Sequence, residues 1–133
     1  MMSEQRGSMA VETVILTPIF VLLLVFVSYA SRVVIAQHEL NRAADVAARA
    51  ASQVRSTSMT SRGIETATSS IQANRSHCLN FTAEVSRRSI AGIIHAEVRT
   101  SCRIDVFGLS ILGIRSPELT ATSTEVVDVY RHP

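Results

Sequence analysis

The sequence contains no tryptophan and no lysine, and other aromatic residues are few. Four Phe and two Tyr leave little bulky side-chain volume for a core, so we expect a small domain stabilised by a covalent link or by partners. All thirteen basic residues are Arg, interspersed with eleven acidic residues, and the net charge is only +2. Because there is neither a basic run nor an aromatic stacking ladder, no nucleic-acid partner is predicted.

Residues that support catalysis or metal binding are also scarce. The four His are scattered at positions 38, 77, 95 and 132. The sequence has no H-E-x-x-H motif, no G-x-S-x-G motif and no phosphate-binding glycine loop. We therefore predict that the chain is not an enzyme, binds no small-molecule substrate, and requires no cofactor and no metal.

The two cysteines, Cys78 and Cys102, allow three interpretations. In an oxidising compartment, a disulfide is the simplest; it would close a loop of about 25 residues and stabilise the fold by about 3 kcal/mol. Two buried free thiols are the second interpretation. A zinc site that adds His77 and His95 is the third, although the spacing matches no standard ligand pattern. The sequence favours the disulfide.

Apolar residues are concentrated in one block, residues 11–36. Its centre, TVILTPIFVLLLVFVSYA, carries no charge and would span about 27 Å as a helix, close to the thickness of a bilayer's hydrocarbon core. The block is too long for a signal-peptide core, and no A-x-A-like cleavage site follows it. A retained transmembrane helix over residues 8–36 is therefore predicted.

Two residues of this block are unusual in a transmembrane helix. Pro18 removes one backbone donor, which membrane helices tolerate. Glu12 lies at the edge of the block, where a carboxylate is costly unless it is paired or reaches the headgroups. Two interpretations stay open: Glu12 lies among the headgroups without a role, or it pairs with a cation in an assembly.

After the apolar block, residues 37–55 continue the helical pattern with an Ala-rich seam. The seam recurs at spacings of four and three residues: Ala36, Leu40, Ala43, Ala47, Ala50 and Val54. No Gly or Pro lies between Pro18 and Val54, so one continuous helix is expected. The seam fits packing on the chain's own C-terminal domain as well as packing among neighbouring subunits.

Residues 56–133 are expected to form a small α+β domain. The Ser/Thr-rich residues 56–61 break the first helix, and a second helix is predicted over residues 62–75. Its expected apolar face comprises Ile64, Ala67, Ile71 and Asn74. Alternation predicts a strand over residues 96–106 with Cys102 on the buried face, and further strands around residues 81–85 and 119–130, separated by a loop over residues 107–117. The predicted fold class is α+β: a long transmembrane helix with its continuation, a short helix and about three antiparallel strands.

The most specific signal lies before the apolar block. Gly7 is followed by Glu12 and the apolar run, in RG-SMAVE-TVILTPIF. This pattern resembles type IV prepilins, in which a membrane peptidase cuts after the Gly and the Glu is the fifth residue of the mature chain. The apolar run and the following AQHELNRAADVAARAAS are similar to TadE-like minor pilins (pseudopilins) of the tight-adherence (Flp) pilus. The tail SCRIDVFGLSILGI…LTATSTEVVDVYR is similar to that of actinobacterial members.

The resemblance implies a function and a set of roles. Residues 1–7 would be a leader that a prepilin peptidase removes between Gly7 and Ser8, and Glu12 would pair with the free amine of Ser8 on an adjacent subunit. Membrane lipid, other pilus subunits and the assembly machinery would be partners. The N-terminus would be cytoplasmic and the C-terminal domain extracytoplasmic. The alternative is a membrane-anchored accessory or binding protein that does not enter a filament.

Overall fold

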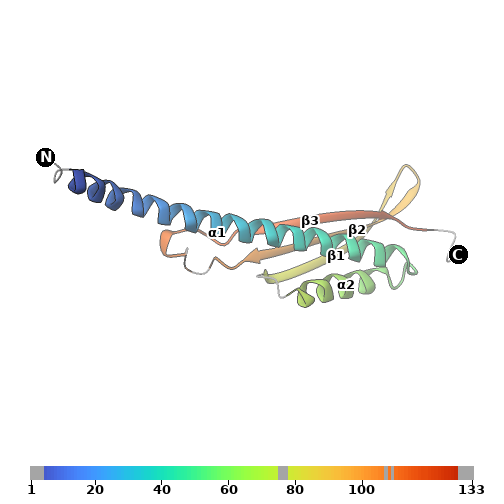
Figure 1. Cartoon of the computed structure of the whole chain (residues 1–133). Coiled ribbons are helices and arrows are strands. Elements are labelled where there is room, and N and C mark those ends of the chain that lie inside the picture. The colour runs from blue at the N-terminus through green and yellow to red at the C-terminus, as the bar shows by residue number, and fades with distance from the viewer. Residues whose placement is uncertain (1–4, 75–77, 107, 109, 129–133) are drawn as a thin grey trace. The chain divides into compact units, whose positions relative to one another are not determined.

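The computed structural model of the 133-residue chain describes residues 5–74, 78–106, 108 and 110–128 (Figure 1). In chain order the elements are α1 (Gln5–Ser52), α2 (Met59–Ala73), β1 (Cys78–Ile90), β2 (Ile93–Ile104), the short 3-10 helix η1 (Ser110–Leu112) and β3 (Glu118–Val126). The chain divides into two units, Met1–Arg32 and Val33–Pro133, and α1 contributes residues to both. The predicted α+β fold class is confirmed.

The first helix is continuous through Pro18. Its sequence beyond Pro18 is free of Gly and Pro and rich in Ala and Leu, which have high helix propensity. The helix ends at Ser52, whose Oγ donates a hydrogen bond to the carbonyl of Arg49 at 2.9 Å. The expected single helix is thus present, and it ends two residues before Val54.

The three strands form one antiparallel sheet in the order β1-β2-β3. Ala91 and Gly92 join β1 to β2 with φ values of 52° and 82°, and Ile90 pairs with Ile93 across this turn. Two positive φ values in a two-residue turn match the right-handed twist of a hairpin. β2 thus begins three residues before the predicted start at Ala96, where the consecutive residues Ile93 and Ile94 break the alternation, and it ends at Ile104, two residues before the predicted end.

In the second unit, α1 and α2 cover the same face of the sheet (Figure 1). Alternate residues of β2 point toward the helices. Cys102 is buried as predicted, and the other buried residues of its face are Ala96, Val98, Thr100 and Ile104, followed by Val106 beyond the strand. Leu40 of α1 packs with Cys102 and Ala121. The last strand ends at Val126, earlier than predicted, and the predicted end at Tyr130 lies outside the described residues.

The Ala-rich part of α1 is buried against this unit. Its buried side chains are Ala36, Leu40, Ala43, Ala44, Ala47, Ala48 and Ala51. The predicted seam is correct up to Ala47, whereas Ala50 is only half-buried and Val54 lies beyond the helix. Two adjacent rows are buried because the helix packs against the sheet as well as α2. Of the two alternatives for the seam, the structure shows packing on the chain's own domain.

The second helix buries only part of the predicted face: Ala67 and Ile71 are buried as predicted, whereas Asn74 is exposed beyond the end of the helix. Met59, Gly63, Ala67 and Ile71 are buried, whereas Ile64 is 39% exposed. The helix begins at Met59, three residues before the predicted start, because this side chain packs with Ala51 and Ala96. A glycine was not expected on the buried face, since its contribution depends on close approach and not on hydrophobicity.

Candidate functional site

The residues with predicted processing and assembly roles lie in the first turns of α1. Gly7 and Ser8 lie within the helix, which begins at Gln5. Glu12 follows Ser8 by four residues, about one turn further along the same side of the helix. The side chain of Glu12 is exposed, and among the described residues it makes no ion pair. The carboxylate is therefore accessible to a cation from another chain.

The first unit presents an extensive apolar surface. From Val11 to Val27 the large apolar side chains are all at least 40% exposed, and the most apolar stretch has a mean hydropathy of 2.6. Among the helices that the structure describes, α1 is the one that is long and apolar enough to cross a membrane. An exposed apolar surface of this extent normally contacts lipid or protein. The helix thus indicates single-pass membrane anchoring.

Two hydroxyl groups within the apolar stretch donate hydrogen bonds to the helix itself. Thr17 Oγ1 donates to the carbonyl of Thr13 at 2.6 Å, and Ser28 Oγ donates to the carbonyl of Leu24 at 2.8 Å. Such bonds to the preceding turn let Ser and Thr lie in an apolar environment without water, and they often accompany Pro in membrane helices. The polar atoms of Thr17 and Ser28 therefore do not oppose membrane insertion.

The two cysteines are joined in the structure. Cys78 at the start of β1 and Cys102 of β2 form a disulfide with an S–S distance of 2.03 Å. Cys102 is 2% exposed and belongs to the same apolar cluster as Leu40 and Ile71. The bond therefore links the first two strands beneath both helices. The structure contains this disulfide and not two free thiols; His77, from the zinc alternative, lies outside the described residues.

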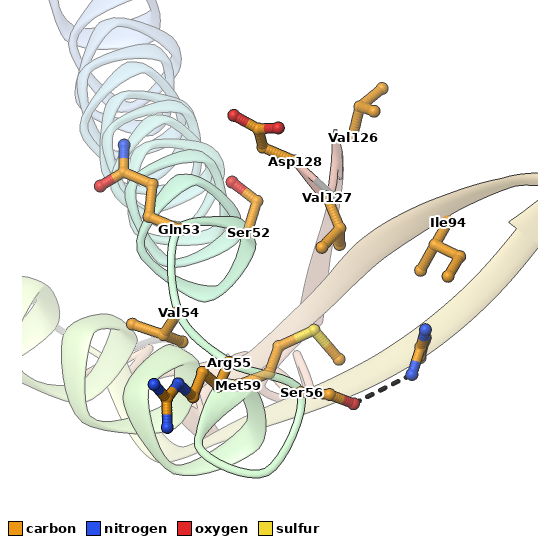
Figure 2. Close-up of a pocket in the computed structure, with 11 residues that line it drawn as sticks. Ser52, Gln53, Val54, Arg55, Ser56, Met59, Ile94, Val126, Val127 and Asp128 are labelled. Atoms are coloured by element: carbon orange, nitrogen blue, oxygen red, sulfur yellow. Dashed lines mark hydrogen bonds between the residues drawn. The ribbon is translucent and has the colours of Figure 1, made fainter. Parts of the chain in front are cut away.

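A pocket of about 280 Å³ lies where α1 ends (Figure 2). Its lining comes from the end of α1, the turn to α2 and all three strand segments: Ser52, Gln53, Val54, Arg55, Ser56, Met59, Arg87, Ile94, Val126, Val127 and Asp128. Arg87 Nη1 donates to Ser56 Oγ at 2.9 Å and so ties β1 to that turn. The described lining includes neither His nor Cys. Sequence reasoning missed this pocket because its residues come from separated segments and form no motif.

Comparison with known proteins bears on the N-terminal part of the chain. The family model described as TadE-like protein matches residues 7–49. No curated protein and no solved structure matches the chain. The matched range begins at Gly7, contains Glu12 and Pro18, and includes most of the Ala-rich helix. The resemblance was based on these residues and also on the tail, residues 101–131, which lies outside the matched range. The resemblance to TadE-like proteins is therefore confirmed over residues 7–49.

Proposed function

We propose that the protein is a structural minor pilin, or pseudopilin, that assists assembly of a tight-adherence pilus. The observation that carries this proposal is Glu12: an exposed carboxylate at the edge of an exposed apolar helix, without an ion-pair partner among the described residues. A carboxylate in this setting is costly unless a cation compensates it. A neighbouring subunit would supply that cation.

In the proposed mechanism, a prepilin peptidase cuts between Gly7 and Ser8. The new amine of Ser8 on one subunit then pairs with Glu12 on the next. Between packed apolar helices the effective dielectric constant is low, so the attraction is stronger than at a protein surface. Leaving either charge buried and unpaired is strongly unfavourable there, so the pair also selects the correct axial register of the subunits.

Before assembly, the membrane would hold the subunit. Residues 8–36 would cross the cytoplasmic membrane with the N-terminus on the cytoplasmic side, while residues 37–55 and 56–133 would lie outside the cytoplasm. The Cys78–Cys102 disulfide supports this orientation, because such bonds persist in oxidising compartments. Leader cleavage, membrane orientation and incorporation into the pilus are three parts of this proposal, and each can be tested by its own experiment.

The decisive experiment is replacement of Glu12 in a strain in which the variant is the only copy of this protein. We expect Glu12→Ala to reduce the amount of sheared pili while the membrane level of the protein stays normal, and Glu12→Asp to restore part of the assembly. Glu39→Ala, on the same helix but beyond the apolar stretch, is the matched control. Normal piliation with Glu12→Ala would remove the assembly role of this carboxylate.

The pocket favours a second candidate function. Its lining combines two arginines, Arg55 and Arg87, with the carboxylate of Asp128 and with apolar side chains such as Met59, which suits a polar, partly apolar ligand. This would fit a membrane-anchored accessory or binding protein outside the filament. An uncleaved N-terminus together with absence from sheared pili would support this candidate over the minor pilin.

A further inference from the structure

The connection between β2 and β3 carries two exposed isoleucines, Ile111 and Ile114. Residues 106–115 read VFGLSILGIR. Among the described side chains, Ile111 is 89% exposed, more than any other large apolar residue, and Ile114 is 39% exposed. Gly108 and Gly113 have φ values of 89° and 74°, so the chain turns sharply on each side of η1. These glycines allow the short helix to present Ile111 away from the core.

This loop lies at the end of the second unit where α1 enters it. Gln37 Nε2 donates to the carbonyl of Thr120 at 3.0 Å, and this places the entering turns of the helix beside the start of β3. Leu40 packs against Cys102 near the end of β2 and against Leu119. The unit begins at Val33, so its first residues are the end of the apolar block, residues 11–36. The β1–β2 hairpin, with Ile93, lies at the other end of the sheet.

Charged side chains flank the loop. Arg103, Arg115, Ser116 and Glu118 line a shallow depression beside it. Asp105 is also exposed, so two acidic residues balance the two arginines. Binding to anionic surfaces through net charge is therefore weak at this end, and the apolar side chains supply the main attraction. Exposed aliphatic residues beside Arg side chains are typical of segments at a membrane interface, where Arg reaches the phosphates.

We propose that residues 110–114 insert into the headgroup region of the membrane that α1 crosses, as a second contact between the domain and the bilayer. The occupant is lipid because the apolar block, residues 11–36, ends within the first residues of this unit, which keeps this end of the domain close to the bilayer surface. The inference rests on the proposed function only in requiring that α1 spans the membrane. It requires neither leader cleavage nor filament entry.

Labelling of the full chain in liposomes of phosphatidylcholine and phosphatidylglycerol tests the proposal. Both native cysteines are in the disulfide, so Ile111→Cys introduces one reactive thiol for an environment-sensitive fluorophore. Ile93→Cys is the matched control, since this isoleucine is 51% exposed at the opposite end of the sheet. Leu23→Cys reports on insertion of α1. Spin-labelled lipid acyl chains quench a fluorophore that lies in the membrane, and iodide quenches a fluorophore that is exposed to water.

We expect lipid-borne quencher to act about threefold more strongly on the labels at 111 and 23 than on the label at 93, and iodide to show the reverse order. A label at 111 that behaves like the label at 93, while the label at 23 is in lipid, overturns this inference and leaves membrane anchoring intact. Protection from both quenchers at 111 would indicate a protein contact and would also overturn it. A label at 23 in water overturns membrane anchoring and this inference together.

Discussion

Gly63 of α2 faces Val85 of β1 so closely that a Cβ atom at position 63 would lie 2.7 Å from Cγ2 of Val85. The same Cβ would lie 3.4 Å from Cβ of Ala51 on α1. One glycine therefore sets the distance at which the second helix packs on the sheet and beside the first helix. In a domain whose helices bury mostly Ala, the stability depends on such close approach.

Gly63→Ala should therefore destabilise the domain, even though Ala is the better helix former by about 1 kcal/mol. Overpacking against a β-branched side chain costs about 1–3 kcal/mol, so we expect a net loss in the free energy of unfolding. Urea unfolding of the full chain in detergent, followed by circular dichroism, would measure it. Combining the change with Val85→Ala removes the clashing methyl groups, and the double variant should lose less stability than the two single losses added together. Additive losses would contradict the steric explanation.

Thr100 connects the sheet to α1 through its hydroxyl. This side chain is fully buried, and its Oγ1 lies 3.3 Å from the carbonyl oxygen of Leu40 and 3.4 Å from that of Ala121. The single hydroxyl proton serves one of these acceptors at a time. Thr100→Val keeps the shape and removes the donor, so we expect a loss of about 1 kcal/mol in the free energy of unfolding. The exposed Thr122 on β3 is the control position, and Thr122→Val should be close to neutral; equal losses at the two positions would show that the buried bond contributes nothing.

The disulfide should be a major source of stability in this small domain. It joins residues 24 positions apart, and replacement of both cysteines (Cys78→Ser with Cys102→Ala) should lower the free energy of unfolding by about 2–4 kcal/mol. Adding reductant to the wild-type protein should produce a similar loss, and it should leave the cysteine-free variant unchanged. An unfolding midpoint that stays the same after complete reduction would show that the bond has no effect on stability.

The features that follow from periodicity could be predicted from the sequence. The buried face of β2 is correct because polar and apolar residues alternate strictly there. The continuity of α1 after Pro18 follows from the absence of Gly and Pro in that part of the helix. The sequence does not show which residues of α1 after Ala47 are buried, because nearly every candidate position is Ala and has the same hydrophobicity. Gly63 was missed because close packing of a glycine leaves no hydrophobic pattern. The exposure of Ile111 depends on how a loop folds, which composition does not specify.

Leader processing is the prediction closest to the family assignment. In the structure Gly7 lies in the first turn of α1, which begins at Gln5, so a peptidase would need to unwind only that turn. Gly is a poor helix former, which lowers the free energy needed for this unwinding, and it lets a protease approach the backbone closely.

We expect the wild-type protein, extracted from membranes that contain a prepilin peptidase, to have an intact mass that lacks Met1 to Gly7. Gly7→Val should retain the full-length mass, whereas Ser8→Ala should still be cut. A full-length wild-type chain beside an active peptidase would exclude cleavage at this position, while leaving α1 as a membrane anchor.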